Sequence, residues 1–434
     1  MDNNRDNNYY DMDSLKQRDS AKKPGAGKQK STFISGIVVG MTVSLVILCV
    51  VLLVTRLQKI LDEKEENSGL ITLDQESAID EDVLQKMMLL EKTIDKYFYL
   101  EEVTDEELEN GIYKGMLEAL HDPYSEYYTA EELNTLMEQT EGIYYGIGAY
   151  VSIDTETSLP KISGLIANAP AEEVGLRAND LIYEVDGESV YGMSLTEVVS
   201  LIKGPEGTEV LLTIIREGDY LEITVPRRRV ENPTVEYEML ENNMAYIRIT
   251  EFEDVSVDQF ADAMATMRGS GMEGLILDLR SNPGGSLSAV VDIARMLLPE
   301  GLVVYTEDKY GDRDEYRCDG KHKLEVPLVV LVDMNSASAA EVLSGAIQDY
   351  GIGTLVGTTT FGKGIVQQIV PYKDGSAVKI TISSYFTPKG RNIHGIGIEP
   401  EVECEFDSEA YYDEVNPYDN QLEKAKEVLQ GMMN

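Results

Sequence analysis

The feature that most constrains the fold is a junction between an apolar run and a helical pattern at residues 326 to 343. Val326 to Val332 is an apolar, β-branched run of the length expected for a buried strand. Asp333-Met334-Asn335 interrupts it, and helical spacing begins at Ala339. Ser338 stands between them, where unpaired N–H groups and the helix dipole stabilise negative charge. The junction therefore predicts an α/β core with a place for an oxyanion.

A lysine and an amide follow this junction. Lys363 lies between two glycines in what we expect to be a second strand. Because side chains alternate along a strand, Lys363, Ile365 and Gln367 should share one face. Near Ser338, this predicts a Ser-Lys nucleophile pair with an orienting amide. The residues alone leave an alternative open, in which Ser338 and Glu341 form a capping box and Lys363 is solvated.

The combined pattern carries more information. Asn-Ser-Ala-Ser-Ala-Ala-Glu at 335–341, then Phe-Gly-Lys-Gly at 361–364 and Val-Gln-Gln at 366–368, resembles the carboxyl-terminal processing (tail-specific) protease family. The resemblance implies that Ser338 is the nucleophile, Lys363 the base and Gln367 the support of the lysine.

A glycine pair follows another expected strand, Gly274 to Leu279. Such a pair adopts backbone conformations closed to other residues and can direct N–H groups into a site. The alternative is an ordinary strand-to-helix turn. The resemblance implies that Gly284, or Gly285 in its place, supplies one oxyanion-hole N–H group and that Ala339 supplies the other.

Residues 141–226 have a different pattern of short strands and glycine turns. The series Pro-Ala-x-x-x-Gly-Leu-Arg (170–177), Asp-Leu-Ile (180–182) and Val-Asp-Gly (185–187) resembles a PDZ domain. Such a module adds an extended peptide to a strand edge and receives its terminal carboxylate on backbone N–H groups. The resemblance places the peptide groove beside the helix Leu195 to Ile202, and the carboxylate loop at Tyr145, Gly146, Ile147 and Gly148.

Arg177 follows the Gly-Leu pair of this module. The resemblance suggests that it relays the state of the PDZ domain to the core and so gates the active site. The alternative is an ion pair with a nearby carboxylate such as Asp180.

Composition limits the partners. The formal net charge of −41 argues against nucleic acid, because binding a polyanion depends on clustered lysine and arginine. Neither a CxxC motif nor a Cys/His cluster occurs, so we expect no structural zinc site and no cofactor. Whether Cys318 and Cys404 pair is open.

The N-terminal region predicts a membrane anchor. Residues 1–30 are polar and form an expected disordered cytoplasmic tail. Within 31–55, Phe33 to Val54 is apolar and long enough to span a bilayer, without a small-residue cleavage site after it. Lysines before the span predict a cytoplasmic N-terminus and an extracytoplasmic catalytic part. Residues 56–80 form an expected stalk.

The chain is thus expected to be a multidomain α/β protein: a single transmembrane helix, a helical segment at 81–140, a PDZ domain at 141–226 and a crotonase-like α/β protease core with a C-terminal helix at 227–434. The helical segment is a candidate homodimer surface. The expected function is cleavage of proteins with apolar C-terminal tails by an anchored serine endopeptidase. The alternative is a catalytically inactive PDZ scaffold that holds such tails.

Overall fold

The computed structural model describes residues 78–100, 102–413 and 415–434. The expected tail, membrane anchor and nearly all of the stalk lie outside these residues. Among the helices that are described, none is long and apolar enough to cross a membrane. The chain divides into two units between residues 102 and 103. In the first, the described helix is α2 (Glu81–Tyr97), which begins where the Asp80 carboxylate accepts from the Val83 N–H group.

The second unit opens with helix α3 (Asp105–Glu118), strand β1 (Glu126–Tyr128) and helix α4 (Ala130–Glu141). Both helices start at a threonine capping box, which satisfies N–H groups that the first turn leaves unpaired. Strand β1 pairs in antiparallel register with β18 (Ala377–Phe386) of the core. The expected segment 81–140 is therefore not one helical body, because α2 belongs to the first unit and β1 to a core sheet.

The PDZ region has its own sheet and its own core. The chain enters and leaves it through the paired strands β2 (Ile143–Gly146) and β9 (Arg228–Glu231). Its sheet has the order β3-β4-β5-β7-β8, with β6 beside β5. The remaining elements are β3 (Ala149–Ile153), β4 (Pro160–Leu165), α5 (Pro170–Glu173), β5 (Leu181–Val185), β6 (Glu188–Ser189), α6 (Leu195–Ile202), β7 (Glu209–Arg216) and β8 (Asp219–Pro226).

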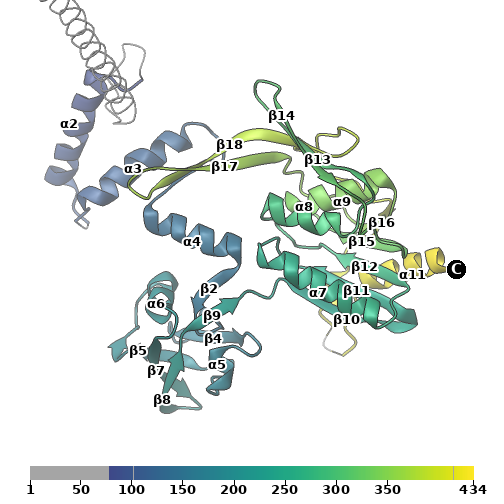
Figure 1. Cartoon of the computed structure of the whole chain (residues 1–434). Helices are drawn as coiled ribbons and strands as arrows, with labels where there is room; N and C mark the ends of the chain where they lie inside the picture. Colours follow the sequence, from purple (N-terminus) through teal and green to yellow (C-terminus); the bar gives the residue numbers. More distant parts are fainter. Residues whose placement is uncertain (1–77, 101, 414) are drawn as a thin grey trace, which may run out of the picture. The chain divides into compact units, whose positions relative to one another are not determined.

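The core of the second unit contains a largely parallel sheet of order β10-β11-β12-β15-β16-β19, antiparallel only between β10 and β11. Figure 1 shows helix α11 at this sheet, near the C-terminus. The strands are β10 (Val235–Met239), β11 (Met244–Ile249), β12 (Gly274–Asp278), β15 (Leu328–Val332), β16 (Thr354–Gly357) and β19 (Val402–Glu403). The helices are α7 (Val255–Gly269), α8 (Leu287–Arg295), α9 (Ala339–Tyr350) and α11 (Asn420–Met433), with a short turn η1 (Glu241–Asn243) before β11 and α10 (Ser408–Tyr411) before α11.

Both faces of this sheet are covered. Leu275 and Leu277 pack with helices α7, α8 and α9, whereas Ile276 and Val329 belong to a second cluster with Leu429 of α11. Alternate residues of one strand therefore face two different apolar layers, which explains why β15 is apolar throughout rather than alternating.

A second, antiparallel sheet lies on the other side of α8 and α9 (Figure 1), both of which contact β13. Its order is β1-β18-β13-β14, and β17 also pairs with β18. Its further strands are β13 (Gly301–Asp308), β14 (Arg313–Cys318) and β17 (Ile365–Pro371). Cys318 is buried, and it and Cys404 are both free thiols.

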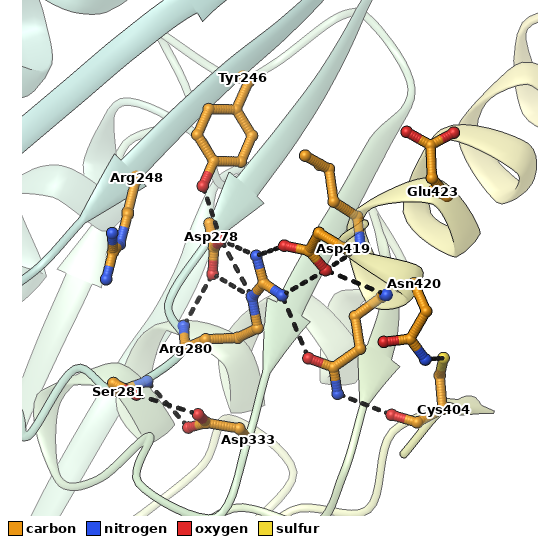
Figure 2. Close-up of polar contacts among 12 residues, drawn as sticks. Tyr246, Arg248, Asp278, Arg280, Ser281, Asp333, Cys404, Asp419, Asn420 and Glu423 are labelled. Atoms are coloured by element: carbon orange, nitrogen blue, oxygen red, sulfur yellow. Dashed lines mark hydrogen bonds and ion pairs between the residues drawn. The ribbon is translucent and has the colours of Figure 1, made fainter. Parts of the chain in front are cut away.

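A buried ion-pair cluster attaches α11 to the parallel sheet, as Figure 2 shows. Arg280 lies 2.6 Å from the Asp278 carboxylate and 2.9 Å from that of Asp419. The Tyr246 hydroxyl donates to Asp278 over 2.7 Å. Burial opposes the charge, but the two carboxylates raise the pKa of Arg280, so the guanidinium stays protonated.

Candidate active site

The turn between β15 and α9 holds Ser338 in an unusual backbone conformation. Its φ of 54° and ψ of −112° lie outside the helical and extended regions. A non-glycine residue adopts such angles only where the surrounding structure enforces them, and they occur often at active sites. The conformation therefore marks Ser338 as a residue that its neighbours hold in place.

One of those neighbours is Glu341, whose side chain is fully buried. Its Oε2 atom accepts from the N–H groups of Ser338 (2.8 Å) and Lys363 (2.9 Å). Its Oε1 atom accepts from the Gly362 N–H group (2.7 Å) and the Thr360 hydroxyl (2.6 Å). Glu341 thus closes on the backbone of Ser338, as a capping box predicts. The same carboxylate also holds the loop that carries Lys363.

A second group joins the same two residues. The buried Tyr385 hydroxyl lies 3.0 Å from the Ser338 carbonyl oxygen and also contacts the Lys363 carbonyl oxygen. Burial, and then the charge of Glu341, raises the pKa of Tyr385 well above its ordinary value. The hydroxyl therefore keeps its proton and acts as a donor. Neither this role nor that of Glu341 toward Lys363 was predicted, because both depend on long-range contacts.

The glycine pair lies directly against the serine turn. A Cβ atom on Gly284 would lie 2.7 Å from Ser338 Cβ and 3.0 Å from the Ala339 nitrogen. The Gly284 N–H group already donates to Asn282 Oδ1 over 2.8 Å. The N–H groups of Gly285 and Ala339 form no hydrogen bond within residues 103–413. The lack of a side chain at Gly284 therefore lets this loop lie against the Ser338 turn, while Gly285 and Ala339 have N–H groups that are free to donate.

Asp333 ties the two loops together. It accepts from the Ser281 N–H group over 2.9 Å, a contact visible in Figure 2. The fully buried Ser336 hydroxyl bonds to the Leu279 carbonyl oxygen over 2.8 Å. The Ala337 N–H group donates to the Asn282 carbonyl oxygen over 2.9 Å. These bonds fix the distance between the glycine pair and the serine turn.

Lys363, Ser338 and Gln367 line one cavity of about 380 Å³, together with Gly285 and Ala339. The cavity thus brings the predicted serine, lysine and amide together with both unpaired N–H groups. Burial, and secondarily the charge of Lys379, lowers the pKa of Lys363, against opposing effects of Asp122 and Glu126. A lowered pKa favours the neutral amine that a general base requires.

Lys363 lies outside the strand that was expected to contain it, because β17 begins at Ile365. Ile365 and Gln367 both line the cavity, as strand alternation predicts, and Val366 lines it as well. The register with β18 shifts beside Gln367, but the extra residue, Ile382, belongs to β18. A loop held by Glu341 brings Lys363 to the same cavity.

The PDZ region has a groove of about 290 Å³ between α6 and the edge strand β3. Gly146, Ile147 and Gly148 line it, whereas Tyr145 does not. The N–H groups of Ile147 and Gly148 have no hydrogen-bond partner in the second unit as described. Gly148 has φ +75°, and a Cβ atom there would lie 2.2 Å from Ala169 Cβ. Only glycine fits this turn, which leaves two donors available.

Arg177 does not form the ion pair named as its alternative role. Its side chain is exposed, and only its backbone N–H group donates to Asp180, over 2.8 Å. The guanidinium that binds Asp180 is that of Arg216, at 2.6 Å. Asp180 is almost fully buried, and its charge is compensated by Arg216, which is less exposed than Arg177.

Comparisons with known proteins match three regions of this chain. Residues 243–404 match the family model Peptidase family S41, residues 161–216 match PDZ domain, and residues 50–132 match Activating protease CtpB N-terminal domain. The Carboxyl-terminal-processing protease of Synechocystis sp. is 35% identical over 322 residues, which cover 73% of this chain and 75% of that protein.

Further relatives bear related names. The Carboxy-terminal processing protease CtpA of Bacillus subtilis is 36% identical over 309 residues, covering 71% of this chain and 66% of that protein. The solved structure of a photosystem II D1 C-terminal processing protease is 31% identical and covers 73% of this chain and 86% of that one, with a TM-score of 0.44. The chain therefore belongs to the carboxyl-terminal processing proteases of peptidase family S41 and is a serine protease with a PDZ domain.

Proposed function

We propose that this protease is an endopeptidase that captures the C-terminal tails of proteins in its PDZ groove and cleaves with Ser338 and Lys363. The observation that carries the proposal is the shared support of these two residues. One buried carboxylate, that of Glu341, binds both backbones, and both side chains line one cavity. An inactive scaffold would need neither the strained serine nor the lysine of lowered pKa.

The cavity supports acyl transfer. The Ser338 Oγ atom bonds to the peptide carbonyl carbon while its proton moves to Lys363 Nζ. The N–H groups of Gly285 and Ala339 bind the oxygen that becomes negative, and one such donor is worth about 3–4 kcal/mol. When the C–N bond breaks, the Lys363 ammonium returns the proton to the leaving amine. Water then attacks the acyl carbon while Lys363 takes one of its protons, and Lys363 gives that proton to Ser338 Oγ as the bond between Oγ and the acyl carbon breaks.

The groove supports recognition of a free chain end. Strand β3 lies at the edge of its sheet, so an extended tail can pair with it. The N–H groups of Ile147 and Gly148 would receive the terminal carboxylate. Val151 and Val199 line the same groove and favour an apolar final side chain.

The cleavage test uses the full-length protease and an unstructured protein with an apolar C-terminus, supplied as free acid and as amide. We expect cleavage of the free acid, slower cleavage of the amide, and none by Ser338→Ala or Lys363→Ala. Lys363→Arg should not restore turnover, because arginine does not deprotonate. Tail binding by the unmodified chain without any cleavage would instead support the scaffold. Equal rates on acid and amide would exclude carboxylate-led recognition.

We also propose that residues 33–54 anchor the protease with its catalytic part outside the cytoplasm. The support is the apolar span and the lysines before it. Protease added to intact cells should leave a small N-terminal fragment protected. Protection of the whole chain would contradict this topology.

A homodimer through the helical region is a further part of the proposal. Met88, Leu89 and Leu90 of α2 are exposed apolar side chains that a second copy would cover. Sedimentation of the full chain should show a dimer, and Leu89→Glu should yield a monomer. A monomer in both cases would exclude it.

A further inference from the structure

The amine of Lys363 lies over an aromatic ring from a distant part of the chain. Its Nζ atom is 4.1 Å from the ring centroid of Tyr124, in the turn between α3 and β1. A tyrosine ring attracts an ammonium group through its negative face, and does so more strongly when water is excluded. Tyr124 and Lys363 are both half-buried. The ring therefore favours the protonated form of the lysine, which exists after the lysine has taken the proton of Ser338.

Asp122 holds the turn that carries this ring. Its Oδ1 atom accepts from the Tyr124 N–H group (3.1 Å), and its Oδ2 atom accepts from the hydroxyls of Ser125 and Thr381 (both 2.6 Å). The Thr381 N–H group donates to Ser125 Oγ over 3.1 Å, which fastens the turn to β18. Burial opposes ionisation, but these hydrogen bonds lower the pKa of Asp122, so the carboxylate is charged.

The same carboxylate determines how the Gln367 amide is oriented. The Gln367 Nε2 atom lies 3.1 Å from Thr381 Oγ1. A carboxylate can only accept, so the Thr381 hydroxyl must give its proton to Asp122. The oxygen of that hydroxyl then faces Gln367 as an acceptor, and the amide must present its NH₂ group to it. The carbonyl oxygen of Gln367, which lines the same cavity as Lys363, is then left as an acceptor.

Charges around Lys363 act in both directions. Burial and the Lys379 ammonium favour the neutral amine, whereas Asp122 and Glu126 favour the ammonium form. Lys379 is itself held by Glu126, at 3.0 Å, and by the Tyr128 hydroxyl. A general base must accept a proton and later release it, so such opposing effects suit a group that alternates between both forms.

We propose that Tyr124 and Asp122 are positioning residues of this protease: the Tyr124 ring holds the ammonium form of Lys363, and Asp122, through Thr381, orients the Gln367 amide. The inference rests on the proposed function, because it assumes that Lys363 is the base. It assigns a role to the Asp-Pro-Tyr-Ser turn at 122–125, which lies outside the PDZ region and the region matched to the peptidase model, and within the region matched to the CtpB N-terminal domain.

The first test compares Tyr124→Leu with Tyr124→Phe in the full-length protease, using the unstructured free-acid substrate. We expect Tyr124→Leu to lower kcat about tenfold with little change in KM. Without the ring, the ammonium form loses support, so the rising limb of the pH–kcat profile should move to lower pH by about 0.5–1. Tyr124→Phe keeps the ring face and should restore both kcat and the profile.

Tyr310→Leu is the matched control. The Nζ atom of Lys309 lies over the ring of Tyr310, 5.0 Å from its centroid. Tyr310, however, is exposed in the turn between β13 and β14. We expect normal kcat and an unchanged pH profile. Wild-type kinetics in Tyr124→Leu would overturn the inference, as would a Tyr124→Phe variant as impaired as Tyr124→Leu.

The second test addresses the relay to Gln367. Thr381→Val should lower kcat about fivefold to tenfold, as for one lost hydrogen bond, and Thr381→Ser should restore it. When combined with Gln367→Ala, the effect of Thr381→Val should shrink, because both act on one amide. Fully additive losses would refute the relay. If Lys363→Ala itself keeps turnover, the proposed function fails; if Lys363→Ala is inactive while Tyr124→Leu is normal, only the positioning role fails.

Discussion

The Tyr385 hydroxyl donates a hydrogen bond to the Ser338 backbone carbonyl oxygen over 3.0 Å. Tyr385 belongs to the antiparallel sheet, whereas Ser338 precedes a helix that packs on the parallel sheet. The hydrogen bond therefore fixes the turn of Ser338 relative to a second layer of the core. Because the hydroxyl also contacts the Lys363 carbonyl oxygen, one buried donor keeps the serine and lysine loops together.

Removal of this donor should impair catalysis beyond its cost in stability. Tyr385→Phe removes the hydroxyl from the Lys363 carbonyl oxygen and from the Ser338 carbonyl oxygen, which still accepts from the N–H groups of Glu341 and Val342. We expect a loss of about 1–3 kcal/mol in the free energy of unfolding. Turnover should fall as well, because the two loops are no longer joined. In the control Tyr350→Phe, a similar bond to the Leu302 carbonyl oxygen is lost outside the cavity. Denaturant unfolding should show a loss in both variants, and a kcat assay a loss in Tyr385→Phe alone.

Gly284→Ala should block the oxyanion site. The added methyl group would lie 2.7 Å from Ser338 Cβ and 3.0 Å from the Ala339 nitrogen. We expect kcat to fall about 100-fold, as when one oxyanion donor is removed. Gly311 also has positive φ, +87°, but open space around it, so Gly311→Ala introduces backbone strain alone. If Gly284→Ala and Gly311→Ala retain equal activity, a methyl group at position 284 does not block the oxyanion site.

Activity should respond to the charge of Lys379. Burial chiefly lowers the pKa of Lys363, and the Lys379 ammonium lowers it further. The base acts when neutral, so activity rises as pH increases through the pKa of Lys363. Lys379→Met removes a repelling charge, raises that pKa and should move the rising limb of kcat/KM to higher pH. Lys309→Met, in the exposed turn, should leave the limb in place; an unmoved limb in Lys379→Met would contradict the electrostatic account.

Arg280 should be important for stability rather than for chemistry. Arg280→Met leaves Asp278, which is 1% exposed, without its counter-ion. Breaking a buried pair on one side costs about 3–5 kcal/mol. Thermal unfolding should therefore show a large fall in Tm. Lys426→Met removes a partly exposed pair with Glu423 on the same helix α11 and should change Tm little. An equal fall in Tm in both variants would mean that the ion-pair cluster in Figure 2 stabilises the fold no more than an exposed ion pair does.

Local signals in the sequence were enough for most elements. The helix Leu195–Ile202 occurs at the predicted bounds, and the strand expected at Gly274 to Leu279 is β12, Gly274–Asp278, because apolar periodicity and capping residues act over a few neighbours. The apolar run before Ser338 is a strand, β15, buried between two helical layers. The motif around Ser338 and Lys363 was likewise readable, since its residues form two short segments.

Contacts between distant segments decided the rest. Strand β1 joins β18 across some 250 residues, and this pairing brings Asp122 and Tyr124 to the lysine. Lys363 precedes β17, yet its side chain lines the same cavity as Gln367. The sequence shows a glutamate three residues after Ser338, but only the tertiary structure shows that Glu341 also binds the backbone of Lys363. Register and loop closure depend on packing across the whole core, so no local pattern determines them.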